Sequence, residues 1–189
     1  MRSRRATATL AALALLAAVG CAESGAPSMT TDRAGGDATA PAPPRPLAGR
    51  GIRAALPASW DGAIRGAGGR AILHAASFPL GSTAGDDLAG AAVARIPADG
   101  VLIALVEMGK DALGSVLYSS EGVPEIAPVQ IAPRVASGPI PDRAGGVQRF
   151  FTAAGRPFML YVAVGSLADA EPLVAEANRV LATLEISAR

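Results

Sequence analysis

The distribution of apolar residues divides the chain into three parts with different patterns. An apolar stretch covers residues 6–19, almost no large apolar side chains occur over residues 22–49, and short apolar runs follow over residues 50–189. The last part is long enough to enclose a hydrophobic core of its own. We therefore expect a single globular domain over residues 50–189.

Most apolar runs in that domain are short, and several alternate with the period of two that is typical of a half-buried strand. Turn-forming Gly and Pro residues separate them. Residues 101–107 are apolar at every position except the last, which favours a strand buried on both faces at the centre of its sheet. Residues 88–96 fit either a short helix or a strand. The predicted strands are residues 52–56, 63–65, 71–80, 101–107, 147–152 and 158–164.

One long helix is predicted over residues 166–184, with a single apolar stripe along it. Ser166 and Asp169 fit a helix start, because the serine can cap free N–H groups and the aspartate favours the positive end of the helix dipole. Strands in succession followed by one helix indicate an α+β domain. We expect an antiparallel sheet of five or six strands with the C-terminal amphipathic helix packed across one face.

The N-terminal stretch has the pattern of a secretory signal peptide. Three arginines precede residues 6–19, and this apolar run is shorter than the ~20 residues that a membrane-spanning helix needs. The run ends in Ala18-Val19-Gly20-Cys21, which resembles the lipobox of bacterial lipoproteins. The resemblance implies a signal peptide over residues 1–20 and lipid, such as palmitate, on Cys21. An ordinary signal peptide with an unrelated cysteine is the alternative.

Residues 21–49 are expected to form the lipidated cysteine and a disordered tether. This segment is rich in Pro, Gly and Ala, and it cannot bury enough apolar surface to offset the entropy lost on ordering. A coil of ~28 residues has a reach of roughly 30 Å. The lipobox resemblance and this tether together predict a domain at the extracytoplasmic face of the cell membrane, anchored through Cys21.

Charge and composition exclude several classes of partner. Without the three arginines of the signal peptide, 14 basic residues face 16 acidic ones, and no basic cluster remains, so we expect no nucleic-acid partner. Cys21 is the only cysteine, so lipidation would leave no disulfide and no thiolate metal ligand. Asp86 and Asp87 lack the spacing of a calcium loop. We expect no metal and no cofactor.

Three aromatic residues are candidate walls of an apolar ligand site: Trp60, Phe78 and Tyr161. Trp60, the only tryptophan, has two interpretations, a core residue closing a turn or an aromatic wall. His74, the only histidine, is either structural or functional. A hydrolase would have to use Ser77 or Asp86 and Asp87 with His74, although Ser77 would lie on the opposite face of a strand from His74.

Residues 108–141 have the least regular pattern, because five prolines between positions 124 and 141 prevent long helices or strands. Long ordered loops often carry function, so we expect a partner-facing surface here.

The order of elements resembles that of the PsbP/Mog1-like domains of actinobacterial envelope lipoproteins. The points of likeness are the opening strand that ends in Leu56-Pro57-x-x-Trp60, the late hairpin and the final amphipathic helix. This resemblance implies binding or scaffolding and carries over no catalytic residues.

Three functions remain in order of preference. The expected one is a non-enzymatic binding or accessory module of the cell envelope, with an envelope protein or an apolar ligand as its partner. A carrier of a lipid or another apolar ligand is the alternative, and a hydrolase is the third.

Overall fold

Eight strands and one long helix make up the part of the chain that the computed structural model describes, residues 42–83, 85–133 and 140–189. The predicted signal peptide and Cys21 lie outside these residues. Three 3-10 turns, η1 (Lys110–Ala112), η2 (Val116–Tyr118) and η3 (Pro128–Gln130), interrupt the loops. The other elements are β1 (Arg45–Gly49), β2 (Ile52–Leu56), β3 (Asp61–Ala67), β4 (Arg70–Ala76), α1 (Gly90–Val93), β5 (Val101–Glu107), β6 (Gly145–Ala153), β7 (Arg156–Val164), α2 (Ala170–Leu181) and β8 (Glu185–Ile186).

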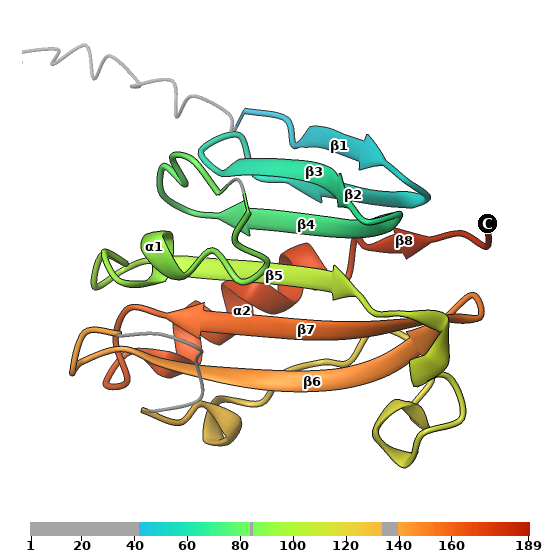
Figure 1. The fold of residues 1–189 in the computed structure, drawn as a ribbon. Helices are drawn as coiled ribbons and strands as arrows, with labels where there is room; N and C mark the ends of the chain where they lie inside the picture. The colour runs from blue at the N-terminus through green and yellow to red at the C-terminus, as the bar shows by residue number, and fades with distance from the viewer. Residues whose placement is uncertain (1–41, 84, 134–139) are drawn as a thin grey trace, which may run out of the picture. The chain divides into compact units, whose positions relative to one another are not determined.

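Five strands form an antiparallel sheet in the order β3-β4-β5-β7-β6 (Figure 1). The strand at its centre is β5, as its apolar sequence predicts. The late hairpin of β6 and β7 is also confirmed, with Ala153 opposite Arg156. The antiparallel sheets and the C-terminal helix are consistent with the expected α+β class.

Two-residue turns join three pairs of neighbouring strands. In each turn both central residues have positive φ, as a type I′ hairpin turn requires, and the second residue is glycine. The turns are Arg50-Gly51, Gly68-Gly69 and Ala154-Gly155. These turns set the strand register, because a two-residue loop leaves no slack for slippage.

A second, three-stranded sheet has the order β1-β2-β8, and it was not expected. The predicted tether ends too late, because β1 pairs with β2 along its whole length. Two contacts order this segment: the Arg50-Gly51 turn reverses the chain, and the Arg45 guanidinium donates to the Trp60 carbonyl at 3.0 Å. Leu47 also packs against the core.

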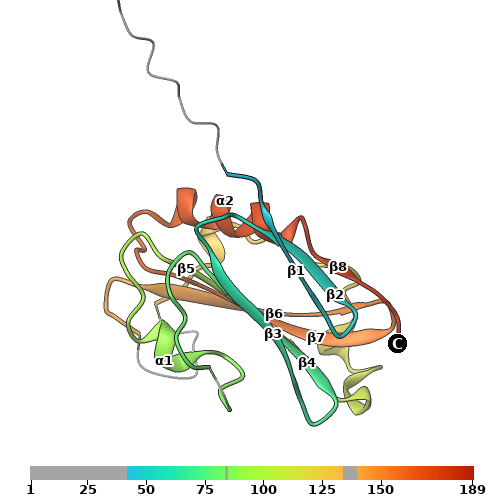
Figure 2. The same ribbon diagram turned by 90° about the horizontal axis from the view of Figure 1, so that it is seen from above.

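One face of the five-stranded sheet, here called the helix face, is covered by α2 and the small sheet (Figure 2). Large strand residues such as Leu105 and Leu160 meet the apolar stripe of α2 there. Ala177 is fully buried in the middle of the stripe, and its small side chain lets the helix approach the sheet. Each fully buried large apolar side chain contributes about 1.5–3 kcal/mol. The buried residues of α2 are Leu173, Val174, Ala177, Val180 and Leu181.

The helix is shorter than the expected residues 166–184. Ser166 accepts a hydrogen bond from the Asp169 N–H at 3.2 Å, which holds the turn before α2. Beyond its other end, the Thr183 hydroxyl donates to the Val180 carbonyl at 2.8 Å and accepts the Ala55 N–H at 2.9 Å. Thr183 therefore takes the place of a strand partner beside β2.

The opposite face, here called the loop face, is covered by residues 78–83 and 85–96, which contain α1. Small residues line it, among them Ala76, Ala104 and Ala163. The predicted strand 71–80 ends early, at Ala76, because the chain leaves the sheet at Ser77, whose hydroxyl accepts the Val101 N–H at 2.9 Å. Residues 88–96 thus contain a short helix, one of their two predicted states.

A buried ionic cluster joins the two sheets. The Glu107 carboxylate accepts hydrogen bonds from Arg156 Nε at 2.8 Å and from the Ala71 N–H at 2.7 Å, and it forms an ion pair with Arg189, whose Nη2 lies 3.0 Å away. Arg156 also donates to the carbonyls of Gly51 and Ser187 in the small sheet. Burial alone would raise the pKa of Glu107, but its hydrogen bonds and the two arginines lower that pKa below its ordinary value.

Candidate functional site

Trp60 lies in the core of the helix face and is 2% exposed. Its indole N–H donates to Glu176 Oε1 of α2 at 2.9 Å, so the buried polar atom has a partner. This burial agrees with the first interpretation of Trp60, a core residue that closes the turn before β3.

Phe78 and Tyr161 lie together in the core of the loop face. The five-stranded sheet separates them from Trp60, so the three predicted wall residues do not meet around one cavity. Tyr161 is fully buried, and desolvation raises the pKa of its phenol to about 12. Gly146 makes room for this ring, since a Cβ there would lie 2.8 Å from the Tyr161 hydroxyl oxygen.

His74 is buried in the loop face and holds the loop that covers it. Its Nε2–H donates to the Asp87 carbonyl at 2.8 Å. Burial lowers the pKa of His74, although the hydrogen bond to Asp87 opposes this change, so the ring is neutral at pH 7. The imidazole therefore has the contacts of a structural residue.

The other residues of the hydrolase hypothesis also hold the chain in place. Ser77 accepts the backbone N–H of Val101. The Asp86 carboxylate accepts the N–H groups of Leu88 at 3.1 Å and Ala91 at 3.4 Å. The Asp87 carboxylate lies 3.4 Å from the Arg70 guanidinium. Among the described residues, no group of three or more His, Cys, Asp or Glu side chains could hold a metal ion.

Large apolar side chains are exposed in one stretch of the described chain, residues 113–129. Their exposed fractions are 40% for Leu113, 87% for Val116, 62% for Leu117 and 90% for Val129. The first three lie in the loop after β5, residues 110–118, which we call the apolar loop. All four fall within residues 108–141, the segment with the least regular sequence pattern.

The apolar loop is ordered by its own hydrogen bonds. Two 3-10 turns, η1 and η2, follow each other, and Ser115 N–H donates to the Ala112 carbonyl between them at 3.2 Å. Tyr118 anchors the loop, because its ring packs edge-on against Phe150 at 5.6 Å and its carbonyl accepts the Thr152 hydroxyl at 2.7 Å. The exposed side chains are thus presented on a fixed backbone.

The apolar loop lies far from β1, through which the chain from Cys21 enters the domain. Figure 1 shows β1 along one side of the five-stranded sheet and the loop after β5 beyond the opposite side.

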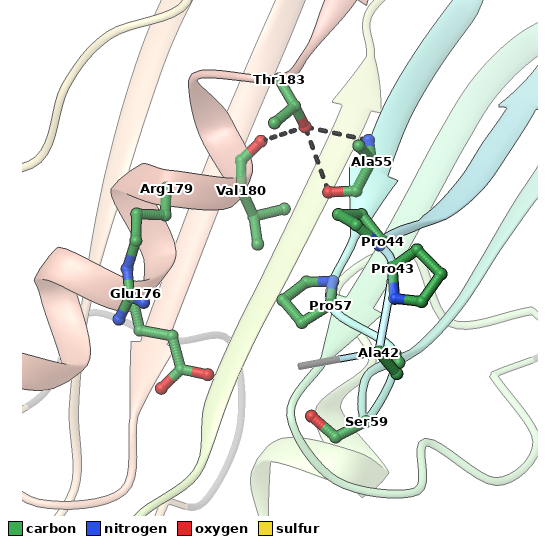
Figure 3. A pocket seen from close by; sticks show the side chains of 11 residues that line it. Ala42, Pro43, Pro44, Ala55, Pro57, Ser59, Glu176, Arg179, Val180 and Thr183 are labelled. Atoms are coloured by element: carbon green, nitrogen blue, oxygen red, sulfur yellow. Dashed lines mark hydrogen bonds between the residues drawn. The ribbon is translucent and has the colours of Figure 1, made fainter. Parts of the chain in front are cut away.

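A groove of about 760 Å³ runs between α2 and the segments that flank β1 and β2. We call it the α2 groove. Figure 3 shows side chains of α2 along one wall and three prolines along the other. Its lining comes from residues far apart in the chain, so no local sequence signal could have revealed it. The lining residues are Ala42, Pro43, Pro44, Ala55, Pro57, Ala58, Ser59, Glu176, Arg179, Val180 and Thr183.

None of the helices in the described part of the chain is both long and apolar enough to cross a bilayer. No known protein family matches this chain, and no curated protein or solved structure matches it either.

Proposed function

We propose that this protein is a membrane-anchored bacterial envelope lipoprotein that acts by binding another protein and not by catalysis. Cys21 would carry the lipid, and the domain would stand at the extracytoplasmic face of the cell membrane. The apolar loop would be its contact surface. The observation that carries this proposal is the concentration of exposed large apolar side chains on one fixed loop.

We expect the partner to be an envelope protein with an apolar cleft. Protein interfaces are centred on a few side chains that become fully desolvated, and fixed loops lose little entropy on binding. Val116 and Leu117 are adjacent and largely exposed, so both can enter a cleft together.

The alternative function, a carrier of a lipid or another apolar ligand, remains a second proposal. Trp60, Phe78 and Tyr161 pack in filled cores, so they offer it no common cavity. The third function, a hydrolase, has less support, because His74, Ser77 and Asp86 each bind backbone groups. The PsbP/Mog1-like assignment is also a proposal, supported by an antiparallel sheet with α2 on one face and α1 on the other.

Site-specific photocrosslinking in cells tests the loop. A photoreactive residue at Leu117 should give a discrete protein adduct, and Val116→Ser in the same chain should abolish it. The matched site is Ala127, which is exposed and lies in the same irregular segment. Equal adducts at Leu117 and Ala127, no adduct, or an adduct with lipid alone would each overturn the proposed docking surface.

Palmitate labelling tests the anchor separately. The wild-type chain should take up label and Cys21→Ser should not. Equal label in both would overturn lipidation at Cys21 without touching the docking surface.

A further inference from the structure

We infer that the α2 groove binds a long-chain fatty carboxylate, with the hydrocarbon chain along the groove and the carboxylate at Arg179. This inference goes beyond the proposed docking function, because the groove and the apolar loop share no residues. It is carried by the lining chemistry, the charge at the rim and the position of the groove in the chain.

One wall of the groove offers mostly apolar surface with few hydrogen-bond donors, the Ser59 hydroxyl being the side-chain donor on it. Pro43, Pro44 and Pro57 have no N–H group, and Ala55 N–H is taken by the Thr183 hydroxyl (Figure 3). An extended peptide would need backbone donors and acceptors along its path, and these walls supply few of them. A hydrocarbon chain needs none. The volume of about 760 Å³ lies within the usual range of ligand pockets, roughly 300–1,000 Å³.

The rim supplies one positive charge for a ligand. Arg179 is exposed, and its guanidinium forms no ion pair among the described residues; its Nε donates to the Ala175 carbonyl at 3.4 Å. Glu176, one helical turn away, is held by the Trp60 indole. One guanidinium matches one carboxylate with two parallel hydrogen bonds, whereas a phosphate dianion would face stronger repulsion from Glu176 than a singly charged carboxylate does.

The groove is also placed where membrane amphiphiles are available. Ala42, the first described residue, lines it, and the sequence predicts a tether over the residues between it and Cys21. A coil of about 20 residues reaches about 25 Å, which keeps the groove near the bilayer. This positional argument rests on the proposed anchor at Cys21; the lining and the charge do not.

The only tryptophan provides the readout. The Trp60 indole is hydrogen-bonded to the groove residue Glu176. A brominated chain in the groove should therefore quench the fluorescence of Trp60 at short range. The probe is dibromostearate, below its micelle concentration, added to the full chain carrying Cys21→Ser. Saturable quenching is expected, and it does not depend on the anchor or on the apolar loop.

Two pairs of variants decide whether the quenching reports the groove. Pro44→Asp places a charge on the apolar wall and should weaken binding by at least about tenfold. Pro79→Asp is its control, because Pro79 is exposed but outside the groove, and it should bind like wild type.

The charge pair tests the orientation of the carboxylate. Arg179→Gln should weaken binding about three- to fivefold, the range of an exposed ion pair, while Glu176→Gln should leave it unchanged or strengthen it. No saturable quenching, or equal quenching in Pro44→Asp and Pro79→Asp, would overturn the inference. Weaker binding in Glu176→Gln would overturn the carboxylate as the ligand group.

Discussion

The helix face and the loop face are built by alternate residues of the same strands, yet different kinds of structure cover them. The helix face carries large side chains such as Leu105 and Leu160, and a regular amphipathic helix packs on them. The loop face carries small residues such as Ala104 and Ala163 beside the large Tyr161, and an irregular segment lies close against it. Small residues let a backbone approach, but that backbone brings polar groups which need partners.

Side chains of the loop face supply those partners. His74 and Arg65 donate to the carbonyls of Asp87 and Asp86. The Asp61 carboxylate accepts the Leu80 N–H at 3.0 Å, and Arg143 donates to the Ile96 carbonyl at 2.7 Å. An apolar cluster fills each face, and on the loop face side chains of the sheet also bind the backbone of the covering segment.

The largest effect should come from a truncation on the helix face. Phe158→Ala removes a fully buried ring that stacks on Phe151 at 5.6 Å, and it should cost about 3–5 kcal/mol in free energy of unfolding. Met159→Ala, the next residue but on the loop face and only half-buried, should cost about 1 kcal/mol. Urea unfolding measures both. Equal losses would contradict the difference between the faces.

The ionic cluster at the end of the helix face should respond to acid. Its lowered pKa means that Glu107 stabilises the fold fully above the ordinary Glu pKa of 4.5, and that this stability is lost as pH falls through the lower folded pKa. Glu107→Gln should cost about 2 kcal/mol at pH 7, since it replaces hydrogen bonds to a charged group.

Melting temperatures measured from pH 7 to pH 3 test this prediction. The acid-induced decrease should be smaller in Glu107→Gln than in wild type. If the melting temperatures of the two proteins fell equally with pH, Glu107 would not be the cause of the acid-induced loss of stability.

Enlarging a side chain should destabilise the protein more at the centre of the loop face than at its edge. Ala104→Val places two methyl groups under the closely packed loop and should cost about 1–2 kcal/mol through overpacking. Ala63 lies in the same cross-strand row, two strands away, but is exposed, so Ala63→Val should change stability by less than about 0.5 kcal/mol. Similar losses at both positions in thermal melts would argue against tight packing beneath the segment that covers the loop face.

The smallest effect concerns His74. Burial lowers the pKa of His74, so its contribution to stability is complete above the ordinary value of 6.5 and decreases as pH falls from there toward the folded pKa. His74→Gln keeps a donor for the Asp87 carbonyl and removes the titration. Its melting temperature should therefore decline less than that of wild type between pH 7 and pH 5, while a steeper decline would refute a neutral, buried imidazole.

The sequence could predict the helix face better than the loop face for a physical reason. Strand alternation and the stripe from Leu173 to Leu181 are periodic, and periodicity indicates both the element and the face it buries. The loop face depends on hydrogen bonds between distant residues, such as Arg143 to Ile96, which leave no local pattern. The segment 108–141 was found only through its lack of pattern.

The small sheet was not predicted, because the sequence signals it through single residues and not through a periodic pattern. The Arg50-Gly51 turn has glycine at the second position, as in the other two hairpins, and this was the available signal for β1. The α2 groove depends on that strand, since Pro43 and Pro44 stand where they do only because β1 pairs with β2. The α2 groove could therefore not be predicted without β1.

The bond between Thr183 and Ala55 has a consequence for self-association. Because the N–H and C=O of Ala55 face Thr183, its cross-strand neighbour Pro46 must turn its own backbone groups toward the free side of β1. At that position proline offers no N–H to an incoming strand. The edge of β1 therefore offers an incoming strand one hydrogen bond fewer at Pro46, which makes it a poorer template for strand addition between copies of the chain.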